Sequence, residues 1–279
     1  MKKQLFLSIF LSFFISFAYA QKQNIVKVRT ADEFVKAIAS NTIIEMEYGL
    51  YSLNSHSQPE TQTDGSGFYV KNISNLTIKG IGKFPAELVL DNDEYATVIK
   101  FIDCNNIILD NVEIGHGASK GYCMGAVVGL KGTKNFTVKN SVLYGSGTYG
   151  IESFEGTSNV LCEKTTIRSC TYGAIYMQAT NDVIFNDCNF VANSNLDIFD
   201  FNNCKNVVFN FCIIKDNRSE ASDYSSQKLF NVQGNEPITL NNCLVKFNSL
   251  DYLANKMGVL KLNNTKMESN LFRKKEFEN

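Results

Sequence analysis

The sequence contains no tryptophan and only two histidines among its 279 residues. The absence of tryptophan removes the largest flat side chain on which a ligand can stack. Two histidines and no Cys-x-x-Cys pair give no indication of a zinc site. An excess of one charge is lacking as well, because 27 basic residues face 28 acidic ones and the formal net charge is −1. This balance argues against a nucleic acid as the partner.

The N-terminus has the pattern of an export signal. Two lysines precede an apolar stretch over residues 5–17, and an Ala-Tyr-Ala motif ends at Ala20, just before Gln21. We therefore predict a signal peptide over residues 1–20, cleaved between Ala20 and Gln21, and a secreted or periplasmic protein. The apolar stretch is shorter than the ~20 residues that a membrane span needs, so we expect no span after cleavage. The residue directly after the cleavage site is Gln21 and not a cysteine, which gives no indication of a lipid anchor.

The rest of the chain, residues 21–279, is enough for one elongated domain and contains an internal repeat. Each unit of the repeat reads as two short apolar strands separated by a polar corner. A repeat of 20–50 residues indicates a solenoid, in which stacked coils bury the apolar faces that no single unit can bury. In the three clearest units the equivalent residues are 23 and 24 positions apart: Asn159, Asp182 and Asn206.

The same register extends over most of the chain. In the second strand of each unit, apolar residues alternate with polar ones, which places the apolar residues on one face. A shift by one residue would expose all of them, so this register is strongly set. Two inward columns result: Leu76, Ile107, Phe136, Val160, Val183, Val207 and Ile238, and Ile78, Leu109, Val138, Cys162, Phe185, Phe209 and Leu240.

This coil pattern resembles that of the pectate-lyase-like right-handed parallel β-helix superfamily, from about Thr30 to the C-terminal region. The resemblance implies an all-β fold, a single-stranded right-handed parallel β-helix, with coils over about residues 68–267. The superfamily includes polysaccharide lyases, glycoside hydrolases, epimerases, adhesins and proteins without known activity. The fold therefore leaves the function open.

A short α-helix is predicted to cap the N-terminal end of the solenoid, within about residues 28–51. Thr30-Ala31-Asp32-Glu33 has the spacing of a capping box, with threonine as N-cap and glutamate three residues later. Phe34, Val35 and Ile38 supply one apolar face. Such a cap covers the strand edges and apolar residues that the first coil would otherwise expose.

Eight cysteines in an exported chain raise the question of disulfides. Most of them fall in the repeated columns, where in-register neighbours point the same way and are poorly placed for bridging. Cysteine also packs well as a small buried residue. We therefore predict packed free thiols, with only Cys123, in a loop, and Cys170, at a corner, outside the columns. One column contains Cys188, Cys212 and Cys243, and another contains Cys104 and Cys204.

The first strand of each unit is predicted to carry a polar ribbon on its outward face. Two interpretations remain open, a solvated sheet face and a sugar-binding groove. Tyrosine offers an apolar surface with a polar tip, and lysine, arginine and amides bind hydroxyls or carboxylates. The alignment gives one inward column, Phe101, Leu130, Phe154, Met177, Phe201 and Val232, and two outward ones, Lys100, Gly129, Ser153, Tyr176, Asp200 and Asn231, and Ile102, Lys131, Glu155, Gln178, Asn202 and Gln233.

Glu152 is the exception in this alignment, because the other members of its column are apolar. A buried carboxylate is costly unless it is paired, and burial raises its pKa. Either the chain at Gly150 turns Glu152 outward, or Glu152 pairs with a nearby base, or it is a buried functional carboxylate. The rest of the column reads Ile99, Val128, Ile175, Phe199 and Phe230.

Two reactions are considered for the ribbon. A β-eliminating lyase needs a cation beside the uronate carboxylate and a base for the α-proton, and the predicted catalytic residues are Lys131, Arg168 and Tyr176. A glycosidase needs two carboxylates, and Glu155 and Asp200, two coils apart, suit only the inverting geometry. The residues predicted to bind the substrate are His116, Lys120, Glu155, Gln178, Asp200 and Asn202.

No cofactor and no metal site is predicted. Asp91-Asn92-Asp93-Glu94 is considered as a calcium site, but it lacks the EF-hand spacing and an acidic turn is the favoured interpretation. The function hypothesis is a monomeric exported β-helix protein that binds or processes an acidic polysaccharide. The alternative is a non-catalytic adhesin or structural module. Any ligand is predicted over the first strands of the middle coils, bordered by insertions at residues 116–122 and 218–224.

Overall fold

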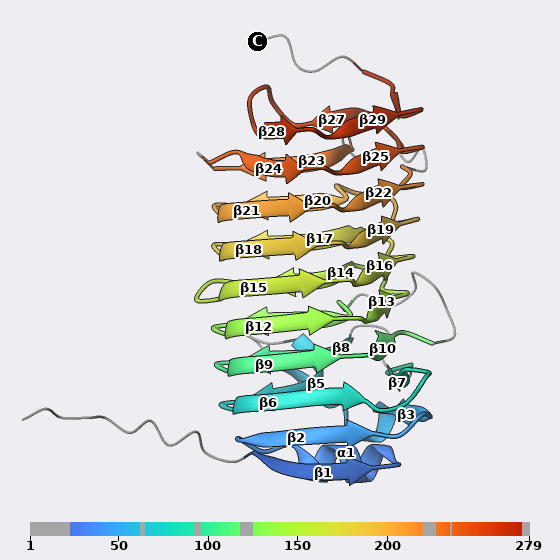
Figure 1. The fold of residues 1–279 in the computed structure, drawn as a ribbon, viewed down its shortest axis with the longest axis vertical. Coiled ribbons are helices and arrows are strands. Elements are labelled where there is room, and N and C mark those ends of the chain that lie inside the picture. The colour runs from blue at the N-terminus through green and yellow to red at the C-terminus, as the bar shows by residue number, and fades with distance from the viewer. Residues whose placement is uncertain are drawn as a thin grey trace, which may run out of the picture.

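The computed structural model describes residues 23–61, 65–91, 96–117, 125–219, 227–234 and 236–274. The chain winds through successive coils that stack along one axis, from β1 and α1 at one end to β28 and β29 at the other (Figure 1). Almost all neighbouring strands are parallel; β4 and β5 pair antiparallel. The predicted all-β solenoid is confirmed, and α1 is the only α-helix in the described part of the chain.

Each coil contributes to three parallel sheets, where the sequence predicted two strands per unit. A single residue with positive φ, such as Asn140, Lys164 or Asp187, turns the chain after the predicted second strand and starts a further short strand. We call the sheets 1, 2 and 3. Sheet 1 contains β1 (Asn24–Val28), β2 (Thr42–Met46), β6 (Ser74–Gly80), β9 (Asn105–Asp110), β12 (Lys134–Lys139), β15 (Ser158–Glu163), β18 (Asn181–Asn186), β21 (Lys205–Asn210), β24 (Ile238–Asn241) and β28 (Leu260–Asn263).

The other two sheets lie on the remaining sides of the solenoid. Sheet 2 contains β3 (Leu50–Ser52), β7 (Ala86–Val89), β10 (Val112–Gly115), β13 (Val142–Tyr144), β16 (Thr166–Arg168), β19 (Asn189–Val191), β22 (Ile213–Lys215), β25 (Leu244–Lys246) and β29 (Lys266–Glu268). Sheet 3 contains β4 (Gln58–Thr61), β5 (Gly65–Lys71), β8 (Ala96–Ile102), β11 (Val128–Lys131), β14 (Tyr149–Ser153), β17 (Gly173–Gln178), β20 (Phe199–Asn202), β23 (Lys228–Gln233) and β27 (Tyr252–Ala254). A 3-10 turn, η1 (Asn54–His56), and a strand pair, β26 (Ser249–Leu250) with β30 (Leu271–Phe272), complete the described elements.

The N-terminal cap forms as predicted. Helix α1 (Ala31–Ala37) begins after Thr30, whose hydroxyl accepts a hydrogen bond from the Glu33 backbone N–H at 3.2 Å. The Glu33 carboxylate in turn accepts the Arg29 N–H at 2.7 Å, so the helix start satisfies its first donors. Phe34 is fully buried, and its ring lies 6.5 Å from that of Tyr51. The helix therefore closes the apolar interior at this end.

The predicted inward columns of sheet 1 form the core. Strand pairing joins Val160 to Val183 and Phe185 to Phe209, in the register that the alternation indicated. All members of the two columns are buried. At the following corner, Ser141, Thr165, Cys188, Cys212 and Cys243 are also buried in one column.

The register of β14 differs from the prediction by one residue. Ile151 pairs with Ile175 and Ser153 with Met177, so Glu152 faces outward opposite Tyr176. Ser153, predicted outward, is fully buried and hydrogen-bonds to the Thr180 hydroxyl at 2.7 Å. Phe154, predicted inward, lies beyond the end of the strand. The cause is that this coil has one more residue between Ser153 and Thr157 than the next coil has between the equivalent Met177 and Thr180. Aligning the coils at Asn159 therefore shifts β14 by one residue.

The cysteines of the described residues are free and buried: Cys104, Cys162, Cys170, Cys188, Cys204, Cys212 and Cys243. The prediction of packed thiols is confirmed for these seven, including Cys170, while Cys123 lies outside the described residues. The signal peptide and its cleavage site at Ala20 and Gln21 also lie outside them. Within the described ranges, no helix is long and apolar enough to cross a membrane.

Candidate functional site

The outward face of sheet 3 carries the predicted polar ribbon, with the register of β14 corrected. Because β8, β11, β14, β17, β20 and β23 pair in register, their outward side chains form columns along the solenoid axis. One column contains Tyr69, Lys100, Gly129, Glu152, Tyr176, Asp200 and Asn231. The next contains Lys71, Ile102, Lys131, Gln178, Asn202 and Gln233.

A cleft of about 250 Å³ opens on this face. It is lined by Lys100, Lys131, Phe154, Glu155 and Gln178. Three of these residues, Lys131, Glu155 and Gln178, belong to the predicted site. The cleft therefore brings two cations, a carboxylate, an amide and an aromatic ring together.

Gly129 positions Lys100 in the cleft. A β-carbon at Gly129 would lie 2.9 Å from Lys100 Cγ, so the glycine leaves room for the lysine side chain to extend over its coil. The Lys100 ammonium lies 5.7 Å from the centre of the Phe154 ring, within the range of a cation–π contact. Neither role was predicted from the sequence, because a glycine in a column of outward residues has no side chain that would indicate a site.

Next to the cleft lies a group of ionisable side chains, formed by Tyr149, Glu152, Tyr176, Asp197 and Asp200. The Tyr176 ring centre lies 6.0 Å from that of Phe154 and 5.5 Å from that of Tyr149, so this group borders the cleft directly. Burial raises the pKa of both tyrosines, and the negative charge of Asp200 raises them further. The two phenols therefore stay protonated beside the carboxylates.

The carboxylates of this group are partly withdrawn from solvent. Burial and the neighbouring Asp197 raise the pKa of Asp200 to about 6, although its carboxylate accepts a hydrogen bond from Asn231 Nδ2 at 3.1 Å. Burial also raises the pKa of Glu152, a shift that Thr148 and Lys100 oppose. Asp197 accepts the Lys228 N–H at 2.8 Å, and the Lys228 ammonium lies 3.5 Å from the same oxygen. Asp200 is thus able to exchange a proton near neutral pH.

Arg168 and His116 lie away from this cleft. Arg168 ends β16 in sheet 2, and its guanidinium carbon lies 4.8 Å from the centre of the Tyr144 ring. Tyr144 donates a short hydrogen bond to Glu87. His116 follows β10, also in sheet 2, is buried, and its Nδ1 is 2.9 Å from the Leu90 carbonyl oxygen. The sequence prediction placed Arg168 and His116 at the border of the polar ribbon. In the structure both residues belong to the side of sheet 2, whereas the ribbon and its cleft lie on sheet 3.

The remaining predicted residues divide between the sheet and the loops. Asn202 pairs with Gln178 at the end of β20 and Asp200 with Tyr176, so both belong to the ribbon. Lys120 lies outside the described residues, as does most of each predicted bordering insertion. Within the described ranges, no group of three histidine, cysteine or acidic side chains is arranged to hold a metal ion. Of the acidic turn considered for calcium, Asp91 accepts the Gly117 N–H at 2.5 Å, and the other three residues are not described.

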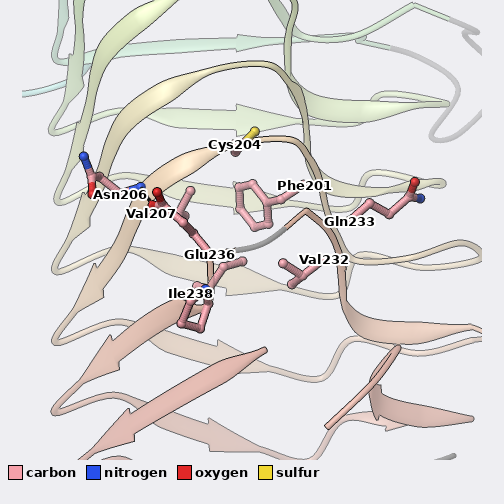
Figure 2. A pocket seen from close by; sticks show the side chains of 9 residues that line it. Phe201, Cys204, Asn206, Val207, Val232, Gln233, Glu236 and Ile238 are labelled. Atoms are coloured by element: carbon pink, nitrogen blue, oxygen red, sulfur yellow. Dashed lines mark hydrogen bonds between the residues drawn. The ribbon is translucent and has the colours of Figure 1, made fainter. Parts of the chain in front are cut away.

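A second hollow lies near the turn that precedes β24, and Figure 2 shows the side chains that line it. They include Phe201, Val207, Val232 and Ile238, all members of the buried columns. The hollow leaves no space for a water-sized group. It is a packing gap between coils.

The stacked three-sheet coils define a protein of the parallel β-helix class, with a cleft on one lateral face. The chain belongs to the family described as the right-handed β-helix region, whose sequence profile matches residues 28–272. This match confirms the right-handed β-helix that the family resemblance implied. Among curated proteins, no sequence matches this chain.

Solved structures share the fold. A pectate lyase from Paenibacillus sp. 0602 has 12% sequence identity and a TM-score of 0.56, over 92% of this chain and 80% of that one. Another pectate lyase has 12% identity and a TM-score of 0.53, over 89% and 70%. A pectin methylesterase mutant, in complex with a hexasaccharide, has 10% identity and a TM-score of 0.51, over 91% and 94%. At these identities the similarity shows the fold alone.

Proposed function

We propose that this chain binds an acidic polysaccharide across the outward face of sheet 3. The observation that carries the proposal is the cleft in which Lys100, Lys131, Phe154, Glu155 and Gln178 meet. Ammonium groups pair with the carboxylates of acidic sugars, and an aromatic ring offers apolar surface to the face of a sugar ring. Carboxylate and amide groups accept or donate hydrogen bonds to hydroxyls.

The direction of the columns supports an extended ligand. Outward side chains from β8 to β23 follow one another along the solenoid axis, at about 4.8 Å per coil. A polymer lying along this axis meets equivalent positions of successive coils. Structures with the same fold include pectate lyases and a pectin methylesterase in complex with a hexasaccharide, which makes pectic polymers the first ligands to test.

The test is a binding titration with polygalacturonate, alginate and chondroitin, with neutral dextran as the control polymer. Lys131→Ala removes a charge-assisted contact and should weaken binding by about 1.5–3 kcal/mol, roughly ten- to a hundredfold. Lys100→Ala should act in the same direction. The matched control is Arg168→Ala, which removes a cation of sheet 2 and should leave the affinity unchanged.

Two results would contradict this proposal. The first is the absence of binding to all three acidic polymers by folded wild-type protein. The second is an unchanged affinity for both lysine variants while their thermal melts match that of the wild type. Either would leave the ribbon as a solvated sheet face.

We also propose that the protein acts outside the cytoplasm, in the periplasm or after secretion. The proposal rests on the signal-peptide pattern of residues 1–20. N-terminal sequencing of the protein recovered from the host periplasm or medium should begin at Gln21. Recovery of the uncleaved chain in the cytoplasm would overturn it.

A further inference from the structure

We propose that two copies of this chain associate tail to tail, by pairing β29, the last strand of sheet 2, with β29 of the second copy. A two-fold axis beside Met267 relates the two copies. The contact uses the end of the solenoid opposite α1, so it does not rest on the proposed binding function of sheet 3. It also differs from the monomer that the sequence analysis expected.

The end of the solenoid opposite α1 presents unpaired strand edges. β28 and β29 are the outermost strands of sheets 1 and 2 at this end (Figure 1). Within the described part of the chain, no strand pairs with their far edges. Such an edge is a template on which another strand can pair, and solenoid proteins need a cap to close it.

The apolar interior reaches the surface at the same end. Leu262 and Met267 continue the inward columns of Leu240 and Val245. Leu240 and Val245 are fully buried, whereas Leu262 is 43% and Met267 is 38% exposed. A second copy stacked on this end would bury both side chains, as a further coil does elsewhere along the solenoid.

The backbone of β29 has the polarity that a symmetric pair needs. The Lys266 N–H donates to the Cys243 carbonyl at 2.9 Å. The Glu268 carbonyl accepts the Phe247 N–H at 3.1 Å, so Lys266 and Glu268 both bond toward β25. Successive residues of a ladder bond to opposite sides, so the N–H and C=O of Met267 face the open edge. Across a two-fold axis, the two copies of Met267 can therefore exchange both hydrogen bonds, as directly opposed residues of an antiparallel pair do.

The charges of β29 fit the same axis. Lys266 and Glu268 flank Met267, and both are exposed. Antiparallel pairing at Met267 sets Lys266 opposite Glu268 of the second copy, and Glu268 opposite its Lys266. These are the non-hydrogen-bonded positions, where opposed side chains lie closest. A parallel pairing would set like charges against each other, so the strand is complementary to itself in the antiparallel arrangement.

The other end of the solenoid argues against a head-to-tail stack. There α1 closes the apolar interior with the fully buried Phe34, so the last coil of a second copy would meet the cap instead of an open core. A two-fold contact uses the same surface on both copies and closes at two. The expected assembly is therefore a dimer and not a filament.

The experiment measures the mass of the full-length mature protein by sedimentation over a series of concentrations. The wild type should form a dimer that dissociates on dilution. Lys266→Glu and Glu268→Lys each set like charges opposite each other at two places, and each should weaken the dimer about tenfold or more. An equimolar mixture of these two variants restores opposite charges at both places and should restore the dimer. Lys205→Glu, at an exposed lysine of sheet 1, is the matched control and should associate like the wild type.

A second pair of variants tests the hydrogen bonds across the axis. Met267→Pro removes the N–H that faces the open edge and leaves the bonds to β25 in place, a position at which an edge strand tolerates proline. Met267→Ala shortens the side chain and keeps the N–H. The proline variant should therefore weaken the dimer more than the alanine variant does, while thermal melts check that both remain folded.

The outcomes decide the inference without reference to the polysaccharide. Loss of the dimer in both charge variants, with recovery in their mixture, supports it. A wild type that stays monomeric at every concentration overturns it and leaves this end to a different partner. A dimer that neither charge variant weakens, or one that the mixture of folded variants fails to restore, overturns it as well. A charge variant that melts early is replaced by Lys266→Gln or Glu268→Gln, which should weaken the dimer in the same direction by a smaller factor.

Discussion

The rings of Phe185 and Phe209 stack in neighbouring coils of sheet 1, with centres 4.5 Å apart and planes inclined by 24°. Both side chains are fully buried. Phe209 also contacts the rings of Phe199 and Phe230 from sheet 3, at 5.2 and 6.0 Å between centres. The pair therefore links two sheets through the middle of the solenoid.

Truncating either ring should destabilise the protein strongly. Phe185→Ala and Phe209→Ala each leave a cavity and should lower the free energy of unfolding by about 3–5 kcal/mol. Because the rings touch, the double variant should cost less than the sum of the two. The measurement is chemical denaturation, with Ile184→Ala, a partly exposed residue of the same strand, as the control. A silent single variant would contradict the assigned register.

The sequence was sufficient for the coils of sheet 1 and for the cap. Alternation set the register of the inward columns, and the Thr30–Glu33 spacing set the helix start. The predicted register was wrong at β14. The one extra residue before Thr157 still leaves apolar residues at alternating positions, so the alternation did not reveal it. Phe154 looked like a core residue, whereas in the fold it lines the cleft.

Only part of the candidate site was predicted from the sequence. Lys131 and Gln178 end strands β11 and β17 of sheet 3, and Glu155 lies in the turn after β14, so the three meet in the cleft. Arg168 does not join them, since a turn at a non-glycine residue such as Lys164 creates sheet 2. Glycine and asparagine are common at positive φ and therefore indicate such a turn in a sequence, whereas a lysine such as Lys164 does not. The contribution of Lys100 depends on the space above Gly129, which only the stacked structure shows.

The thiols offer a second prediction. The seven described cysteines are buried and free, and burial raises the pKa of the Cys170 thiol to about 12. Native protein should therefore react slowly with a thiol reagent, because the thiolate is the reactive form. Protein denatured without reductant should titrate all seven. Mass-spectrometric detection of a disulfide between any two of them would overturn the prediction.

A buried ladder of asparagines gives a third prediction. Asn217 Oδ1 accepts the Asn193 N–H at 3.0 Å, and Asn217 Nδ2 donates to the Phe190 carbonyl at 3.1 Å. Asn217→Ala leaves both buried groups without these partners and should cost about 1–3 kcal/mol for each. The matched control is Asn210→Ala in the more exposed ladder of sheet 1, where Asn210 Nδ2 bonds to Asn186 Oδ1 at 2.8 Å. Equal losses in the two variants, measured by denaturant unfolding, would show that burial of the ladder is not what matters.

The last prediction concerns the pH dependence of stability at Asp200. Burial and Asp197 raise the pKa of Asp200 from its ordinary value of 3.8 to about 6 in the folded protein. Between these two values the folded state binds more protons at this residue than the unfolded state does. The contribution of Asp200 to the free energy of unfolding should therefore fall as the pH rises through this window, and stay constant above it.

A full proton of difference corresponds to about 1.4 kcal/mol per pH unit, and partial exposure of the carboxyl group reduces this value. Asp200→Asn removes the titration, so the stability of this variant relative to wild type should increase between pH 4 and pH 6. The measurement is denaturant unfolding of both proteins at constant ionic strength, with Asp182→Asn, an outward carboxylate of sheet 1, as the control for losing one charge. If the difference between Asp200→Asn and wild type is flat across the window, Asp200 titrates with its ordinary pKa, and a difference that falls with rising pH would mean that folding lowers this pKa.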